Sequence, residues 1–170
     1  SPLNRVSNSK ASGAAWAASN GQSSSYDIND GSDNVRMWSI GYNSTDYPMT
    51  TGTYPAGSLF KSINTDDKGK QTIEYTDNVG HLILKKQQLD DNPAGSHAGW
   101  ICVYNVYDDY GQLRYVIQPE AVKYLDANGW TFSGTTGAQV LDGLCFRYEY
   151  DEKARMTLKK APGAKELYMI

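Results

Sequence analysis

The sequence predicts an all-β fold, mainly of antiparallel hairpins, with at most one short helix near residues 119–128. The 170 residues include 13 tyrosines but only three phenylalanines, and tyrosine favours half-buried strands. Glycine, Asn, Asp and Ser are abundant, which is typical of turns. Short apolar segments recur around an Asp that is often followed three residues later by Gly. That recurrence indicates repeated hairpins.

Three segments align without gaps on Asp77, Asp108 and Asp151, at spacings of 31 and 43 residues. An Asp carboxylate accepts hydrogen bonds from backbone N–H groups two residues further on, and Gly tolerates the positive φ that closes such turns. Gly80 and Gly111 occupy this position in the first two segments. Ala154 replaces Gly in the third, so a different turn or some strain is expected there.

Side-chain alternation predicts the apolar face of each hairpin, because successive residues of a strand point to opposite faces. Counted outward from each Asp, odd positions collect apolar residues on both strands. In the second hairpin the leading-strand set is Ile101, Val103, Asn105 and Tyr107. In the third hairpin the leading-strand set is Leu144, Phe146, Tyr148 and Tyr150. The trailing strands contribute Leu82, Leu84, Leu113, Tyr115, Ile117, Met156 and Leu158. We expect Phe146, Tyr148 and Tyr150 in the core.

The chain divides into three predicted regions: the trailing half of a hairpin at 1–13, an insert at 14–64, and three hairpin repeats at 65–170. Within the insert, a hairpin over 25–42 and irregular chain over 43–58 precede a short strand at 59–63. Pro119 can begin the one helix and Asn128 or Gly129 can end it. Residues 130–141 are expected to form a loop.

The repeats resemble the YD repeats of bacterial Rhs-type proteins, whose pattern is Tyr-Asp-x-x-Gly-Arg-Leu. The resemblance covers residues 1–5 and about 65–170, while 14–64 resemble the non-repeat insert that precedes the core repeats in one branch. The residues that carry the repeat motif are Asp77, Gly80, Leu82, Tyr107, Asp108, Gly111, Leu113, Tyr148, Tyr150, Asp151, Arg155 and Met156.

The resemblance implies a non-enzymatic segment of a long secreted or surface polypeptide. Family repeats form a β-strand spiral that wraps into a hollow shell, and many members carry a toxin-like C-terminal domain inside it. The resemblance implies further repeats of the same polypeptide as partners. The enclosed C-terminal domain and a cell-surface molecule are further candidate partners. The family's self-cleaving aspartyl site has no match in this chain.

Two other functions stay open: a β module that binds surface glycans or proteins, and a glycoside-acting enzyme. A net charge of −3 gives no reason to expect nucleic acid. No apolar run approaches the ~20 residues of a membrane span. The two cysteines form no C-x-x-C pair and the two histidines lie 16 residues apart, which does not fit the spacings of a structural zinc site, and we expect no cofactor.

Several local patterns allow a chemical and a structural interpretation. The segment 27–33 suggests a calcium loop but departs from the EF-hand spacing, so a polar turn competes with it. The acidic pairs at 66–67, 90–91 and 108–109 could serve glycoside hydrolysis but fit solvated turns. His81 and His97 lack a nucleophile motif. The four tryptophans, which could form a sugar platform or anchor a core, are Trp16, Trp38, Trp100 and Trp130.

Cys102 and Cys145 lie six residues before their respective Asp, at equivalent positions of successive repeats. If a trailing strand separates the two leading strands, the sulfurs lie about 10 Å apart. A disulfide needs Cα atoms within about 7 Å. We therefore expect two buried thiols.

Overall fold

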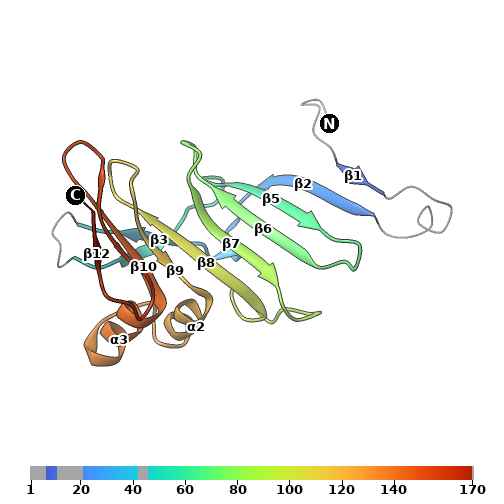
Figure 1. The fold of residues 1–170 in the computed structure, drawn as a ribbon. Coiled ribbons are helices and arrows are strands. Elements are labelled where there is room, and N and C mark those ends of the chain that lie inside the picture. Colours follow the sequence, from blue (N-terminus) through green and yellow to red (C-terminus); the bar gives the residue numbers. More distant parts are fainter. Residues whose placement is uncertain (1–6, 11–20, 42–45, 170) are drawn as a thin grey trace. The chain divides into compact units, whose positions relative to one another are not determined.

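The computed structural model describes residues 7–10, 21–41 and 46–169. The chain forms two compact units, one from residues 1–33 and 55–101, the other from residues 34–54 and 102–170. The structure is mainly antiparallel β-sheet, with two short α-helices in its described part (Figure 1). Most of the expected half-hairpin at 1–13 lies outside the described residues, as does Trp16.

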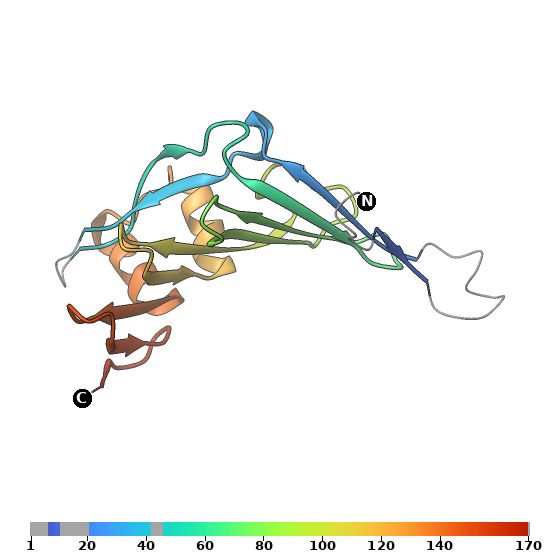
Figure 2. The ribbon, with the colours of Figure 1, turned by 90° about the horizontal axis from the view of Figure 1, so that it is seen from above.

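The described strands of the first unit are neighbours in the order β1-β2-β5-β6-β7, and each adjacent pair is antiparallel. Their bounds are β1 Asn8–Ser9, β2 Gln22–Ile28, β5 Phe60–Thr65, β6 Gln71–Thr76 and β7 Leu82–Gln88. Strands β5, β6 and β7 follow one another as a meander, which is visible in Figures 1 and 2. Within the described residues β1 pairs with β2 alone, so this sheet is not closed.

In the second unit the order is β8-β9-β10-β11-β12, again antiparallel throughout. The boundary between the units falls inside β8. The strand bounds are β8 Trp100–Tyr107, β9 Leu113–Ile117, β10 Cys145–Tyr150, β11 Met156–Lys160 and β12 Leu167–Tyr168. A separate two-stranded ribbon pairs β3 Arg36–Ser39 with β4 Met49–Thr53. The three predicted hairpins are therefore present as β6–β7, β8–β9 and β10–β11.

Each of these three hairpins contains the same β-bulge. In β8–β9, Val106 pairs with Tyr115, but the next pair joins Tyr107 to Leu113, so Arg114 is the extra residue. The corresponding extra residues are Ile83 in β7 and Thr157 in β11. A bulge adds one residue to one strand and increases the local twist.

The bulge makes part of the face prediction wrong. On β8 the buried residues are Cys102, Tyr104 and Val106, which are even positions from Asp108, not the predicted odd ones. On the trailing strands the odd positions are buried as expected, for example Ile117 and Leu158. A change of one residue in register reverses which side chains share a face. Because each hairpin has one extra residue after the turn, the buried positions counted from the Asp are even on the leading strand and odd on the trailing strand.

The third hairpin also differs from the core prediction. Phe146, Tyr148 and Tyr150 are only half-buried, while Cys145 and Leu158 are buried. The rings of Phe146 and Tyr148 stack with centroids 6.5 Å apart. Their partly apolar, partly wet position suits tyrosine, whose hydroxyl stays in contact with solvent.

The predicted hairpin over 25–42 is wrong. Strand β2 pairs with β5, and β3 pairs with β4, a strand inside the segment expected to be irregular. The reason is Asn29, which is 2% exposed and whose side chain binds the backbone of Leu59 and Pro55 at 2.7 and 2.8 Å. These bonds hold residues 55–59 beside the end of β2. The short strand expected at 59–63 is confirmed as β5.

Helix α2 spans Pro119–Ala127, with Pro119 in the first turn and Asn128 as the C-cap, as the sequence predicts. Its buried residues Ala121, Val122 and Leu125 face the core of the second unit. Proline at this position costs no hydrogen bond because the first helical N–H groups have no intrahelical partner.

A second helix, α3 at Gly134–Leu144, contradicts the predicted loop at 130–141 and the limit of one helix. Its Gly- and Thr-rich sequence has weak intrinsic helix propensity. Tertiary contacts stabilise it instead: near its C-terminus, the Asp142 carbonyl accepts hydrogen bonds from the Lys160 ammonium at 2.7 Å and from Gly163 N–H at 3.2 Å. No helix in the described part of the chain is long and apolar enough to span a membrane.

Candidate functional site: a pocket between two aspartate turns

Four turns of the described chain share one hydrogen-bond pattern. In each, one Asp carboxylate oxygen accepts the backbone N–H groups two and four residues further on, at 2.8–3.0 Å. The Asp N–H also donates to the carbonyl four residues on. These turns begin at Asp66, Asp77, Asp108 and Asp151. The first was missed as a repeat, although Asp66 and Gly69 show the same Asp-x-x-Gly spacing.

The fourth residue of every such turn has a positive φ. The angle is +82° at Gly69, +98° at Gly80 and +75° at Gly111, and it remains +59° at Ala154. The third repeat therefore keeps the same turn, and the strain expected at Ala154 is present. A left-handed backbone conformation costs a residue with a Cβ about 1–2 kcal/mol, whereas Gly adopts it without this cost.

We expect Ala154→Gly to stabilise the protein by about 0.5–1 kcal/mol, because it relieves this strain at the cost of a more flexible unfolded chain. The measurement is the free energy of unfolding in urea. The reciprocal variant, Gly111→Ala, introduces the same strain in the neighbouring repeat and should destabilise. If Ala154→Gly lowers the stability, the positive φ at residue 154 carries no net cost.

A basic residue four positions after the Asp completes two of the turns. His81 Nδ1 lies 2.9 Å from Asp77 Oδ2, and Arg155 Nε donates to Asp151 Oδ2 at 2.7 Å. Desolvation by burial acts to raise the pKa of Asp77. Hydrogen bonds from His81 and Val79 outweigh this effect, so the pKa of Asp77 is lowered. The Arg155 side chain is the main cause that lowers the pKa of Asp151. Both carboxylates thus act as anionic centres of their turns.

The Asp108 and Asp151 turns border a pocket of about 610 Å³ in the second unit. The paired register of β9 and β10 ends at Tyr115 and Arg147, and the pocket lies beyond that point. Its lining residues are Asp108, Tyr110, Gln112, Arg114, Glu149, Tyr150, Asp151, Glu152 and Ala154. Its volume is within the usual range of ligand pockets.

Arg114, the bulge residue of β9, forms the inner part of this pocket. Its side chain is 8% exposed, and that of Asp108 is 2% exposed. The guanidinium donates to Asp108 Oδ2 at 3.4 Å and, through Nε, to the Tyr148 carbonyl at 3.2 Å. The Arg114 side chain thus joins β9 to β10 where the backbone ladder has ended. The sequence pattern gave no signal for this role, since neighbouring repeats have Ile83 and Thr157 at the same position.

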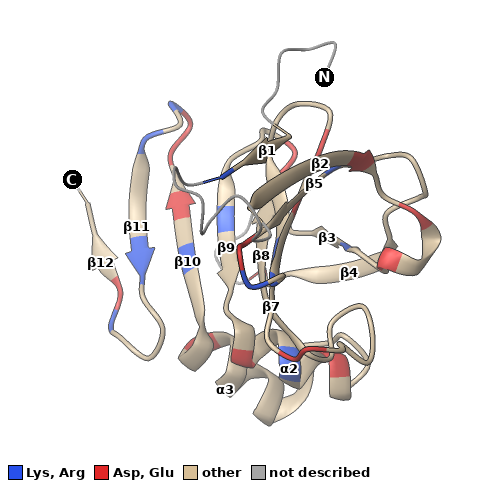
Figure 3. Ribbon diagram, turned by 90° about the vertical axis from the view of Figure 1, so that its right-hand side faces the viewer, with Lys and Arg blue, Asp and Glu red and all other residues tan. Residues whose placement is uncertain are grey.

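Ion pairs balance most of the charge around the pocket. Asp108 pairs with Arg114, Glu149 pairs with Arg147, and Asp151 pairs with Arg155. Figure 3 shows basic segments on β9, β10 and β11, with an acidic segment at the tip of β10. Four carboxylates line the pocket, but three already have a guanidinium partner.

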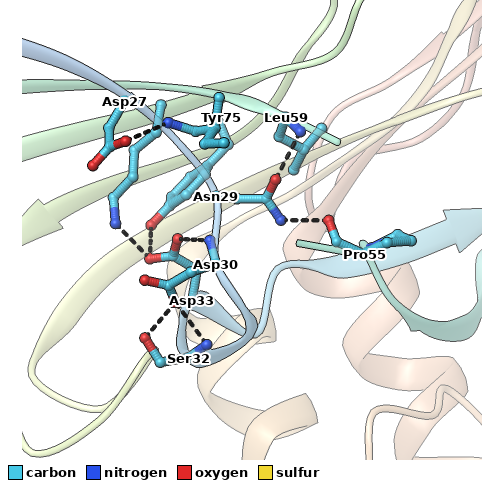
Figure 4. A network of polar contacts seen from close by, with 10 residues as sticks. Asp27, Asn29, Asp30, Ser32, Asp33, Pro55, Leu59 and Tyr75 are labelled. Atoms are coloured by element: carbon cyan, nitrogen blue, oxygen red, sulfur yellow. Dashed lines mark hydrogen bonds and ion pairs between the residues drawn. The ribbon is translucent and has the colours of Figure 1, made fainter. Parts of the chain in front are cut away.

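The candidate calcium loop forms a different polar network in the first unit (Figure 4). Asp33 Oδ1 accepts hydrogen bonds from the Lys61 ammonium and the Tyr75 hydroxyl, each at 2.7 Å. Asp33 Oδ2 accepts the Asp30 N–H at 2.9 Å. A lysine cation therefore occupies the coordination position beside this carboxylate. The described residues contain no group of three or more His, Cys, Asp or Glu side chains arranged for a metal ion.

The acidic pairs and histidines do not converge on one place. The carboxylates of Asp66 and Asp108 accept hydrogen bonds within their own turns, and Asp91 pairs with Lys70 at 2.6 Å. His81 belongs to the Asp77 turn, and His97 is buried, with Nδ1 3.1 Å from Ser96 Oγ.

The described tryptophans do not form a common platform. Trp130 is 5% exposed and packs with Trp38 and Tyr104 at centroid distances of 6.2 and 6.0 Å, and Trp38 packs in turn with Phe132 at 6.1 Å. Trp100 instead lies beneath the Lys86 ammonium, 4.4 Å from the ring centroid. In the second unit, the tryptophans therefore anchor a core.

Cys102 and Cys145 are buried in β8 and β10, with β9 between them. This arrangement agrees with the expectation of buried thiols, since a strand separates the two sulfurs. Burial raises the pKa of the Cys145 thiol to about 12, so this thiol stays protonated at neutral pH.

Comparison of the chain with family models, with curated proteins and with solved structures gives no match.

Proposed function

We propose that this chain is a non-enzymatic structural segment of a large secreted or surface YD-repeat protein. In this proposal, its hairpins stack on further repeats of the same polypeptide. Together they would build a β-shell or scaffold that encloses or displays a C-terminal domain. The observation that carries the proposal is the repetition of one turn four times and of one bulge three times.

Repetition of geometry supports this function because stacked units bury shared surfaces and stabilise their neighbours. An isolated hairpin is marginal in water, so units of this kind depend on adjacent strands. The short strand β12 pairs with β11, and within the described residues its other edge has no strand partner. Leu167 and Tyr168 on it are 60% and 67% exposed. Such an edge suits the addition of a further strand.

We expect the chain to associate in a concentration-dependent way, measured by light scattering during size-exclusion over a roughly hundredfold concentration range. Leu167→Lys should reduce this association, because a charge on an edge strand opposes pairing with another chain. Val79→Lys, at a position 74% exposed on a turn, is the matched control and should associate like the parent. A monomer at every concentration, or equal association of both variants, would count against stacking through β12.

A further inference from the structure

Arg36 on β3 carries a guanidinium group without an anionic partner. No Asp or Glu of the described residues forms an ion pair with it, and no hydrogen bond joins its side chain to them. The other arginines in the described ranges, Arg114, Arg147 and Arg155, each pair with a carboxylate. Arg36 is half-buried, and arginines that leave solvent are usually paired, so its unpaired charge is unusual.

Two nitrogen atoms of β3, Arg36 Nε and Trp38 Nε1, are buried and have no hydrogen-bond partner. They are the only such side-chain atoms in the described part of the chain. The two residues lie two positions apart on one strand, so their side chains share a face, and both pack on the ring of Trp130. The two Nη atoms of Arg36 also lack a partner but are not buried, so their N–H groups reach solvent.

The Trp130 ring holds the guanidinium in place. Arg36 Cζ lies 4.6 Å from the centroid of this ring. Trp130 has a φ of +61°, a conformation that a bulky residue keeps only where its surroundings impose it, and its N–H donates to the Leu125 carbonyl at 2.8 Å. Its ring also packs on Trp38 and Tyr104. An arginine that packs on an aromatic ring can still donate hydrogen bonds from the edge of its guanidinium.

A second donor lies opposite Arg36 across the β3–β4 ribbon. Thr53 on β4 is the cross-strand partner of Arg36, and directly opposed residues share a face, with Cβ atoms about 4.5–5.5 Å apart. Thr53 is exposed, and its hydroxyl makes no hydrogen bond to the described residues. A ligand that binds the Arg36 guanidinium can therefore also accept a hydrogen bond from Thr53.

The charge and shape of these donors restrict the ligand. An unpaired guanidinium repels cations, and its planar fork of N–H groups matches the two oxygens of a carboxylate. It supplies one positive charge in a chain whose net charge is −3, which disfavours an anion with two or more charges. A group with a single negative charge and two coplanar oxygens fits best.

We propose that Arg36 and Thr53 form a binding site for one carboxylate group, supplied by a small organic acid or by an acidic side chain of a polypeptide. The carboxylate oxygens accept hydrogen bonds from Arg36 Nη1 and Nη2, and one of them accepts a further bond from the Thr53 hydroxyl. The Trp130 ring fixes the guanidinium before the ligand arrives, which lowers the cost of ordering on binding. The site includes no residue of β12, so it is independent of the stacking proposed above.

The test is titration of the ¹⁵N-labelled full chain with sodium acetate, and separately with the capped tripeptide Gly-Glu-Gly, followed by amide and arginine Nε–H chemical shifts. Sodium chloride at equal ionic strength and the capped tripeptide Gly-Gln-Gly are the controls. We expect saturable shifts at residues 35–37 and 52–54 and at Arg36 Nε–H, with a dissociation constant of about 10 mM or below. Binding of acetate shows that a free carboxylate suffices, whereas binding of the glutamate peptide alone assigns the site to acidic side chains of a polypeptide.

Arg36→Lys keeps the positive charge but lacks the planar fork, so it should weaken binding about fivefold or more. Thr53→Val removes one donor and should weaken binding about threefold. Arg155→Gln removes an exposed arginine that is already paired with Asp151 and should bind like the parent. The amide spectrum of each variant shows directly whether the fold is retained. Absence of saturable shifts with both carboxylates, equal shifts with chloride or with Gly-Gln-Gly, or unchanged affinity of Arg36→Lys would overturn the proposal.

Discussion

Asp33→Ala is expected to destabilise the protein by about 3–5 kcal/mol. The side chains of Asp33 and Lys61 are only 8% and 15% exposed, and their oxygen and nitrogen lie 2.7 Å apart. Removing the carboxylate leaves the Lys61 ammonium buried without its anion and the Tyr75 hydroxyl without its 2.7 Å acceptor. A buried charge or donor that loses its partner costs far more than the net gain from the intact pair. The free energy of unfolding in urea measures this loss.

Asp27→Ala is the matched control for this experiment. Asp27 lies on β2 of the same unit, is exposed, and accepts a hydrogen bond from the adjacent Ile28 N–H. Its removal should change stability by no more than about 0.5 kcal/mol. Combining Asp33→Ala with Lys61→Met should recover part of the loss, because no cation is then left buried. Equal stability of Asp33→Ala and Asp27→Ala would show that the network of Figure 4 does not stabilise the first unit.

Gly137→Ala is expected to destabilise the protein by about 2–3 kcal/mol. A Cβ at residue 137 would lie 2.3 Å from the carbonyl oxygen of Phe132 and 2.4 Å from its carbonyl carbon. Phe132 is 3% exposed and belongs to the aromatic core with Trp38, so its backbone cannot move away without disturbing that packing. This loss outweighs the gain of about 1 kcal/mol in helix propensity. Urea unfolding followed by circular dichroism measures the net effect.

Gly143→Ala in the same helix tests the reason for this loss. A Cβ there meets no atom within 4 Å, so only helix propensity acts and the variant should gain about 0.5–1 kcal/mol. Opposite signs for the two substitutions would identify the close approach to Phe132 as the cause. Stabilisation by both would mean that the segment 130–136 shifts freely and that α3 is not held by this contact.

The sequence by itself determined the features that depend on a few neighbouring residues. An Asp followed by Gly at the third position closes each turn through its own backbone, so Gly80 and Gly111 could be assigned positive φ from the pattern alone. Pro119 and Asn128 likewise mark the ends of α2 through local backbone constraints. Asp66 carried the same local signal as the other turns.

Only the tertiary structure decided features that depend on distant contacts. The bulge at Arg114 changes which residues of β8 are buried, and strict alternation counted from Asp108 does not include it. Helix α3 has weak intrinsic propensity, and Lys160 and Gly163, both distant in sequence from its start, stabilise it by donating hydrogen bonds to the Asp142 carbonyl in its last turn. The pocket between the Asp108 and Asp151 turns lies beyond the last β9–β10 pair at Tyr115, where Arg114 donates a hydrogen bond to the Tyr148 carbonyl. Side chains brought together from separate strands have no signature in sequence spacing, so this site could be found only from the folded chain.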